Sequence, residues 1–238
     1  MNVLFIISSL SSMAGTERAV INLINILLSK QINVTVLCLY KDTGSFAYKI
    51  NGNMVVKYLG LRQIPKIITA KIFWYFRLFR LLKSKVYDEK NSLIISVGHN
   101  ISFLIPLIIK HKSNTKLIAW EHINFNTIPK LSKFFVSLTY RKFNYVVVLT
   151  EYQKKLMHGI NENIVVIPNS LSFLCANPAK LENKRIIMVG RLAPEKGFDR
   201  VFDIANYIEE KHPDWKIHIY GDGDLLDSLI NTRKELGL

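Results

Sequence analysis

The 238-residue sequence has little cysteine, little acidic charge and no unbroken apolar run long enough to cross a membrane. Two cysteines, Cys38 and Cys175, cannot form a disulfide framework, which excludes a disulfide-stabilised secreted domain and indicates a reducing, cytosolic compartment. The longest stretch without formal charge, residues 91–109, is interrupted at Gly98 and contains Pro106. We therefore expect a buried strand, a polar loop and a short helix there instead of a membrane-spanning helix.

Acidic residues number 18 against 32 basic ones, which gives a formal net charge of +14. An excess of this size indicates an anionic partner, which can be nucleic acid, an anionic membrane surface or a phosphorylated substrate. The excess is unevenly distributed, because residues 1–175 carry a net charge of +15 and residues 176–238 carry −1. We therefore expect two domains, 1–175 and 176–238, with the boundary near residues 177–180.

Short apolar runs rich in Val and Ile alternate with helical patterns along the chain. The expected strands cover residues 3–7, 34–39, 54–58, 93–97, 117–119, 145–149, 164–167, 185–189 and 217–220. Most are apolar on both faces, which is typical of a parallel sheet covered on both sides, and the alternation predicts a doubly wound α/β fold. The first strand lacks the basic leader of a signal peptide. Expected helices include one with Thr16 as its N-cap and an apolar stripe from Val20 to Leu28, and others near residues 198–208 and 225–236.

The loop after the first expected strand is rich in small residues and includes Gly15 and Thr16. In an open α/β sheet, ligands bind outside the carboxyl ends of the strands, and helix N-termini favour anions. The loop has neither the G-x-G-x-x-G pattern nor a Walker lysine, so a dinucleotide or P-loop site is not indicated. The composition is equally consistent with a ligand loop and with a simple flexible turn.

A second loop of this kind begins the expected second domain. Arg191 and Lys196 lie between an expected strand and an expected helix. The two parallel N–H donors of the Arg191 guanidinium and the compact charge of the Lys196 ammonium suit a pyrophosphate at this position. The next strand ends at Gly221 and Gly223, which allow close approach of backbone to a ligand. The alternative for Arg191 is a surface salt bridge to Glu195.

These residues resemble the family 4 glycosyltransferases of GT-B fold. The specific motif is Val-Gly-Arg-Leu-x-x-Glu-Lys-Gly-Phe at 189–198, and the Tyr-Gly-Asp-Gly segment at 220–223 follows it. The first half agrees, with Ile-Ser-Ser-Leu at 7–10, Ala-Gly-Thr-Glu-Arg at 14–18 and Val-Ile-Pro-Asn at 166–169. The Ala-Trp-Glu-His-Ile-Asn segment at 119–124 occupies the place of the Ser-Glu-His/Arg-Asn stretch of the family.

The resemblance, which covers essentially the whole chain, implies a retaining transfer of a hexose-type sugar from a nucleotide-sugar donor. It implies no metal ion or other cofactor. Its implied site residues are, for the donor diphosphate, Arg191, Lys196, Gly221 and Gly223; near the transferred sugar, His122; and in the acceptor cleft, Gly15, Thr16, Glu121 and Asn169. His99, at another strand end, is a second candidate for the cleft.

Family members continue beyond the point that corresponds to Leu238, so the resemblance implies an N-terminal Rossmann-like domain followed by a partial second one. Ala14 replaces the first glycine of the family, and Ser170 stands where glycine commonly follows Pro-Asn. Two expectations stay open at this stage. One is an active glycosyltransferase of surface-polysaccharide synthesis, and the other is an inactive truncated remnant that binds an acceptor or a membrane.

Residues 62–85 contain seven basic residues and no acidic one, interleaved with aromatic and aliphatic side chains. This pattern indicates a basic amphipathic helix whose contacts with an anionic membrane include Lys71, Trp74, Arg77 and Arg80. The expected apolar face consists of Ile68, Ile72, Tyr75, Phe76, Phe79 and Leu82. The alternative is that this stripe packs on the sheet while the basic residues face water.

A second basic cluster, Lys130, Lys133, Arg141 and Lys142, lies beside Phe134 and Phe135. For this cluster we favour the alternative, in which the apolar residues pack on the sheet and the basic residues face water. We expect peripheral attachment to the inner face of the plasma membrane, where a lipid-linked or oligosaccharide acceptor is met. Nucleic acid is not an expected partner, because the chain has no recognisable reader motif and its basic residues accompany bulky apolar side chains.

Overall fold

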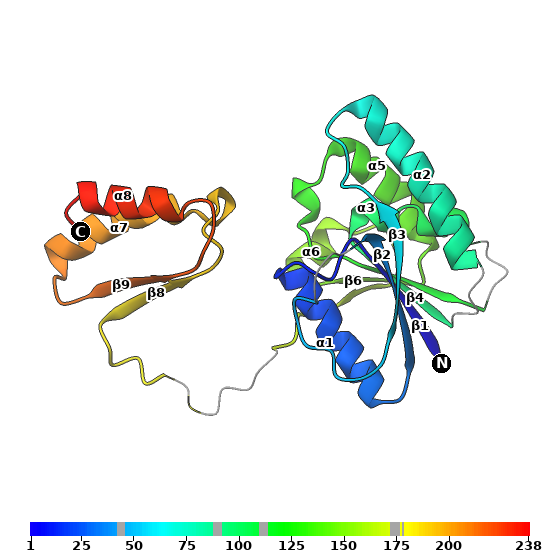
Figure 1. Cartoon of the computed structure of the whole chain (residues 1–238), viewed down its shortest axis with the longest axis horizontal. Helices are drawn as coiled ribbons and strands as arrows, with labels where there is room; N and C mark the ends of the chain where they lie inside the picture. Colours follow the sequence, from blue (N-terminus) through cyan, green and yellow to red (C-terminus); the bar gives the residue numbers. More distant parts are fainter. Residues whose placement is uncertain (42–45, 88–91, 110–113, 172–176, 178) are drawn as a thin grey trace. The chain divides into compact units, whose positions relative to one another are not determined.

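The computed structural model describes residues 1–41, 46–87, 92–109, 114–171, 177 and 179–238. The chain divides into two compact units, Met1–Phe173 and Leu174–Leu238, which are described separately (Figure 1). The expected domain boundary at 175/176, together with Cys175, lies outside the described residues.

Unit 1 is built on a seven-stranded parallel sheet with strand order β3-β2-β1-β4-β5-β6-β7. Its strands are β1 (Asn2–Ile7), β2 (Asn33–Tyr40), β3 (Val55–Leu61), β4 (Leu93–Val97), β5 (Lys116–Trp120), β6 (Tyr145–Val148) and β7 (Ile164–Val166). The predicted doubly wound α/β fold is therefore confirmed. The strand order reverses between β1 and β4, so the switch point at which such sheets bind ligands lies between these two strands.

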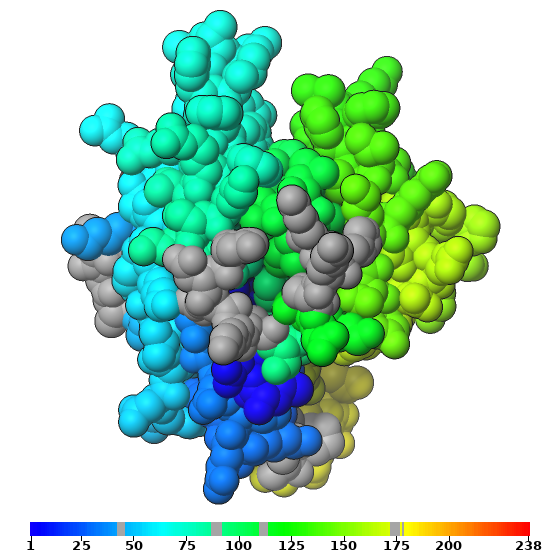
Figure 2. All heavy atoms as spheres, turned by 90° about the vertical axis from the view of Figure 1, so that its right-hand side faces the viewer, coloured from blue at the N-terminus to red at the C-terminus, as the bar shows by residue number. Residues whose placement is uncertain are grey.

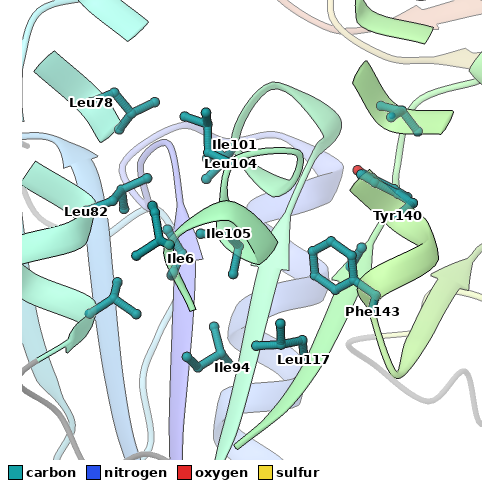
Figure 3. Close-up of a cluster of buried hydrophobic side chains, with 14 of the residues drawn as sticks. Ile6, Leu78, Leu82, Ile94, Ile101, Leu104, Ile105, Leu117, Tyr140 and Phe143 are labelled. Carbon is teal, nitrogen blue, oxygen red and sulfur yellow. The ribbon is translucent and has the colours of Figure 1, made fainter. Parts of the chain in front are cut away.

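Helices cover both faces of this sheet (Figure 1). They are α1 (Gly15–Ser29), α2 (Ile68–Tyr87), α3 (His99–Ser102), α4 (Ile105–Ile108), α5 (Lys130–Thr139) and α6 (Glu151–Leu156), with short 3-10 turns η1 (Phe125–Thr127) and η2 (Tyr140–Lys142). The period-2 alternation of the strands divides the core into two layers. In β1, Val3 and Phe5 pack with α1, whereas Leu4 and Ile6 pack with α2, α4 and α5 (Figure 3).

Helix α2 buries a different stripe from the one that its sequence predicts. Trp74, Leu78, Leu82 and Val86 recur every fourth residue and are buried against the sheet. The predicted membrane contact of Trp74 is wrong, because its side chain is only 7% exposed and its indole N–H donates to the Arg62 carbonyl at 2.7 Å. The free energy gained by burying the large indole ring in the core exceeds the gain from placing it at a membrane interface.

The rest of α2 agrees in part with each of the two alternatives, because some residues of the expected apolar face are exposed and others are buried. Of the expected membrane face, Ile68, Ile72 and Phe76 are exposed, whereas Tyr75 and Phe79 are half-buried and Leu82 is buried. Lys71, Arg77 and Arg80 all face solvent. Within the described part of the chain, no helix is both long and apolar enough to span a membrane.

Unit 2 contains a pair of parallel strands, β8 (Arg185–Val189) and β9 (Lys216–Tyr220), in the register Arg185 with Lys216. Its helices are η3 (Pro194–Lys196), η4 (Phe198–Arg200), α7 (Val201–Lys211) and α8 (Leu226–Glu235). A small core of Leu192, Phe198 and Leu229 holds the loop after β8 against α8. The predicted strand–helix–strand–helix order of this part is confirmed.

Candidate functional site

The candidate site of unit 1 lies at the carboxyl edge of the sheet, where the loops after β1, β4 and β5 begin. The Gly98 N–H donates to the Trp120 carbonyl at 3.0 Å, which ties the loop after β4 to the end of β5. The Glu121 N–H in turn donates to the Val147 carbonyl of β6 at 2.8 Å. Neighbouring strands therefore place His99, Glu121 and His122 at one edge of the sheet, beside the switch point.

The loop between β1 and α1 carries Gly15 and Thr16. The prediction of Thr16 as N-cap is wrong, because α1 begins at Gly15 and its N-cap is Ala14, without a side-chain hydrogen bond. Ser12 Oγ instead donates to Glu17 Oε1 at 2.6 Å, and the buried Glu17 Oε2 has no hydrogen-bond partner among the described residues. A Cβ added at Gly15 meets nothing within 4 Å, so a ligand has room to approach the backbone there.

His122 follows β5 and is partly buried against Trp120, with 4.8 Å between the ring centroids. Burial lowers the pKa of His122 to about 4, so its imidazole is neutral at physiological pH. Its Nε2 atom and the Nε1 atom of Trp120 are both buried and have no hydrogen-bond partner within the described residues. Buried polar atoms are normally paired, so these two unpaired atoms are unusual. The Trp120 N–H can only donate a hydrogen bond, whereas the His122 Nε2 atom can donate or accept one, depending on the tautomer.

Glu121 is completely enclosed beside His122 and belongs to a hydrogen-bond network. The Tyr140 hydroxyl and the His99 backbone N–H both donate to its carboxyl group. Burial raises the pKa of Glu121 to about 7, against the opposing effect of these two hydrogen bonds. Burial and the neighbouring carboxylate also raise the pKa of Tyr140, while Ser102 hydrogen-bonds to its oxygen. The network therefore joins β5, the start of α3 and the end of α5 behind the candidate site.

His99 begins α3 directly after β4. Its Nδ1 atom is a fourth buried polar atom without a hydrogen-bond partner in the described part of unit 1, and burial lowers the pKa of His99. Three ring nitrogens at or just after the carboxyl ends of the neighbouring strands β4 and β5 thus have no hydrogen-bond partner among the described residues. No group of three His, Cys, Asp or Glu side chains is placed to hold a metal ion in the described ranges.

Asn169, the remaining predicted cleft residue of unit 1, is exposed in the loop after β7. That loop reaches α1, because Asn22 Nδ2 donates to Ser170 Oγ at 3.3 Å. Asn169 is thus the neighbour in sequence of Ser170, which contacts α1. Among the described residues, no hydrogen bond joins Asn169 to His99 or His122.

In unit 2, the two predicted diphosphate residues follow β8. Arg191 forms an exposed ion pair with Glu195, which is the alternative considered for it. A hydrogen bond from the backbone N–H of Glu195 itself, and then the hydrogen bond from Arg191, lower the pKa of the Glu195 carboxyl. Lys196 ends η3, and Gly197 follows in the left-handed region with φ +68°. Both cations belong to the loop that leads from β8 into η4 and α7.

Gly221 and Gly223 have a packing role that their sequence did not reveal. A Cβ at Gly221 would lie 2.0 Å from the Gly190 carbonyl oxygen, and one at Gly223 would lie 2.6 Å from that of Leu192. The Leu192 N–H donates to the Asp222 carbonyl at 2.9 Å, which holds the two loops together. These glycines are required by the approach of backbone to backbone, and their contact with a donor stays a prediction.

Tyr140, Trp120 and Ser102 were not identified as site residues from the sequence. Tyr140 lies among basic and aromatic residues that carry no motif, and only the fold brings its hydroxyl to Glu121 (Figure 3 labels Tyr140 at one side of the core). Trp120 belongs to the Trp-Glu-His segment that carries the resemblance. Its closeness in sequence to His122 is the one sequence feature that could have indicated Trp120 as a site residue.

A hollow of about 870 Å³ lies elsewhere in unit 1, lined by Lys116, Arg141, Asn144 and Tyr145 among others. These residues stand at the amino ends of β5 and β6 and therefore at the opposite edge of the sheet from His122. We place the site at the carboxyl edge, because parallel α/β sheets bind their ligands there.

Two Rossmann-like units with loops of this kind after their strands are the architecture of GT-B glycosyltransferases. Solved structures of that class align with all or nearly all of this chain. TarM aligns with 98% of the chain and 74% of its own at a TM-score of 0.72 and 14% identity. The lipopolysaccharide outer core galactosyltransferase WaaB aligns with all of the chain and 65% of its own at a TM-score of 0.69 and 16% identity. At these identities the likeness establishes the fold.

Residues 13–172 match the model of Glycosyltransferase Family 4, and residues 175–238 match that of Glycosyl transferases group 1. The chain belongs to glycosyltransferase family 4, which confirms the predicted resemblance. An uncharacterized glycosyltransferase of Haemophilus influenzae is 30% identical over 98% of the chain, and the amylovoran biosynthesis glycosyltransferase AmsD of Erwinia amylovora is 27% identical over 99%. The chain spans 65% and 66% of the lengths of these two relatives.

Proposed function

We propose that the protein transfers a hexose-type sugar from a nucleotide-sugar donor to a glycan acceptor, with retention of anomeric configuration. The observation that carries this proposal is the set of three buried, unpaired ring nitrogens of His99, Trp120 and His122 at the carboxyl edge of unit 1. A sugar offers hydroxyl groups that satisfy such atoms, and the chain belongs to a glycosyltransferase family.

Arg191 and Lys196 supply the electrostatic part of the reaction in this proposal. When the bond between the anomeric carbon and the diphosphate oxygen breaks, negative charge develops on the departing nucleoside diphosphate. Two cations at the start of a helix stabilise that charge without a metal ion. The Arg191–Glu195 pair must open for a diphosphate to take the place of the Glu195 carboxylate. Supporting this donor class, the similar TarM protein of S. aureus was solved in complex with UDP.

His122 acts as a neutral hydrogen-bonding group in this reaction. Its pKa of about 4 makes an imidazolium unavailable at neutral pH, so it positions a sugar hydroxyl and does not supply charge. Glu121 is a positioning residue, because its carboxyl group is enclosed by Tyr140 and the His99 backbone and cannot reach a substrate.

The acceptor in this proposal is a lipid-linked glycan of surface-polysaccharide synthesis, met at the inner face of the plasma membrane. The name of the Erwinia amylovora relative supports the polysaccharide class, and the name of a Staphylococcus aureus relative, 29% identical over 66% of the chain, is poly(ribitol-phosphate) alpha-N-acetylglucosaminyltransferase. The excess of basic residues in unit 1 suits an acceptor that carries phosphate.

The test is a transfer assay with the purified chain, a panel of nucleotide sugars and lipid-diphosphate-linked acceptors, followed by NMR assignment of the product anomer. We expect turnover with one donor, a product of the same anomeric configuration, and loss of turnover in Arg191→Ala. Binding of donor or acceptor without turnover would contradict the enzymatic proposal and favour a binding module. A product of inverted configuration would contradict retention alone.

A further inference from the structure

One surface of unit 1 exposes large apolar side chains from two neighbouring helices. On α2, Ile68, Ile72, Phe73 and Phe76 are 60% to 76% exposed. On α5, Leu131, Phe134 and Leu138 are 59% to 69% exposed. We call these seven residues the α2/α5 surface. Exposed apolar residues scattered singly are ordinary, whereas a contiguous group of this size marks an interaction site.

Aromatic contacts join the two helices into one surface. Tyr75 of α2 packs on Phe103, and Phe103 packs on Phe135 of α5, with 5.5 Å between ring centroids at each step. Phe135 in turn contacts the exposed Phe134 at 5.6 Å. Figure 2 shows the α2 segment in cyan and the α5 segment in green rising at the same end of unit 1, with a hollow between them. The exposed apolar residues of α2 and α5 therefore lie on two helices that these ring contacts connect.

The charged residues of helices α2 and α5 are all basic. Helix α2 contains Lys71, Arg77, Arg80, Lys83 and Lys85 and no acidic residue. Helix α5 adds Lys130 and Lys133, again without an acid. A second copy of the chain would bring like charges together at this surface, which disfavours a symmetric dimer. An anionic bilayer is complementary on both counts, because its interface accepts aromatic side chains while its headgroups attract lysine and arginine.

We propose that the α2/α5 surface inserts into the interface of an anionic lipid bilayer, with Phe73 and Phe134 as apolar anchors and Lys71 and Arg77 as headgroup contacts. The apolar contact thus comes from two helices and excludes the buried Trp74. This docking is inferred from the exposed residues alone and does not depend on the proposed function. What docking means for the acceptor does rest on the proposed function.

The consequence follows from chain topology. Helix α2 follows the carboxyl end of β3, and its exposed apolar residues lie in its first half. Helix α5 follows the loop that leaves β5 through Glu121 and His122. Helices in parallel α/β units begin at the carboxyl edge of the sheet, so both parts of the surface begin at the edge that carries His99 and His122. A docked molecule would meet an acceptor whose lipid anchor stays in the bilayer while its headgroup reaches that edge.

The experiment is vesicle co-sedimentation of the full chain, without donor or acceptor. The vesicles are pure phosphatidylcholine or an equal mixture of phosphatidylcholine and phosphatidylglycerol. We expect binding to the mixed vesicles and much weaker binding to the neutral ones. The double variant Phe73→Ser/Phe134→Ser should bind mixed vesicles about tenfold or more weakly. Lys71→Gln and Arg77→Gln should each weaken binding about fivefold.

Matched controls replace side chains of equal exposure elsewhere. Tyr207→Ser on α7 and Lys154→Gln on α6 should bind within about twofold of the wild-type chain. Equal binding to both vesicle types, no binding to either, or unchanged binding by the Phe73/Phe134 variant would each overturn the proposal. Conversion of a dimer into a monomer by that variant, with vesicle binding unchanged, would assign the surface to a second copy.

These outcomes separate docking from catalysis. Because the assay contains no substrate, a His122→Ala variant should bind vesicles like the wild-type chain. Failure of sugar transfer with intact vesicle binding would contradict the proposed function and leave the docking surface in place.

Discussion

The Tyr140 hydroxyl donates a hydrogen bond to Glu121 Oε1 inside unit 1, directly behind the neighbouring His122. Tyr140 and Glu121 are both buried, and burial raises the pKa of Glu121 to about 7. A carboxyl group that is about half protonated near neutral pH therefore holds the loop of His99 and the end of α5 in place. This relationship makes the geometry of the site sensitive to pH in a predictable direction.

The first prediction concerns stability against pH. The pKa of Glu121 is higher in the folded chain, at about 7, than the ordinary value of 4.5 that applies when unfolded. Its stabilising contribution is therefore complete below about pH 4.5 and falls, by about 1 to 3 kcal/mol, as the pH rises to about 7. The free energy of unfolding of the wild-type chain should decrease over this range relative to that of Glu121→Gln.

The comparison with Glu121→Gln is needed because His122 acts in the opposite direction. Its folded pKa of about 4 lies below its ordinary 6.5, so its contribution is complete above pH 6.5 and is lost as the pH falls toward 4. Glu151→Gln, at an exposed position on α6, serves as the control and should follow the wild-type curve. A wild-type curve parallel to that of Glu121→Gln in urea titrations from pH 4 to 8 would refute the raised pKa.

The second prediction contrasts two adjacent aromatic residues of α2. Trp74→Ala should lower the free energy of unfolding by about 3 to 5 kcal/mol, because it empties a buried position in the main core. Phe73→Ser should change it by less than about 0.5 kcal/mol, because Phe73 is 75% exposed. Similar losses for both variants in denaturant titrations would mean that α2 buries another face.

The third prediction contrasts glycines of the two units. Gly221→Ala should destabilise unit 2 by about 3 kcal/mol or more, because its Cβ would overlap the Gly190 carbonyl oxygen. Gly15→Ala should leave stability within about 0.5 kcal/mol while raising the KM for substrate, because its Cβ enters open space at the predicted cleft. Thermal unfolding and initial rates give the two readouts. A Gly15→Ala chain with wild-type KM would remove Gly15 from the cleft.

The fourth prediction concerns the Arg191–Glu195 ion pair. Glu195→Gln should tighten binding of a nucleoside diphosphate about two- to fivefold, because Arg191 no longer has to leave a carboxylate. Arg191→Ala should weaken it about tenfold to 100-fold. Isothermal titration calorimetry at low salt measures both effects. Weaker binding by Glu195→Gln would indicate that Glu195 itself helps to hold the donor.

The strand positions could be predicted from the sequence because runs of Val and Ile buried on both faces leave few alternatives to a parallel sheet. The buried face of α2 could not, because apolar residues occur around most of that helix and periodicity does not say which of them meets the sheet. The sequence pattern therefore predicts Trp74 at the membrane, although the residue belongs to the core.

The site was predictable in part for a similar reason. His122, Arg191 and Lys196 stand in motifs, so their strand-end positions follow from the sequence. The Glu121–Tyr140 hydrogen bond depends on the return of the chain through α5, which no local pattern encodes. The reason for Gly221 and Gly223 was also hidden, because a loop that approaches another backbone and a loop that approaches a ligand have the same composition.

The most direct test of the proposed site is the rate of sugar transfer by His122→Ala compared with His158→Ala. His158 is an exposed histidine just after α6 and serves as the matched control. We expect a rate about 100-fold below wild type for His122→Ala, because the proposed hydrogen bond from His122 to the sugar would be lost, and an unchanged rate for His158→Ala. Equal rates for both variants, with both chains folded, would contradict the placement of the site at His122.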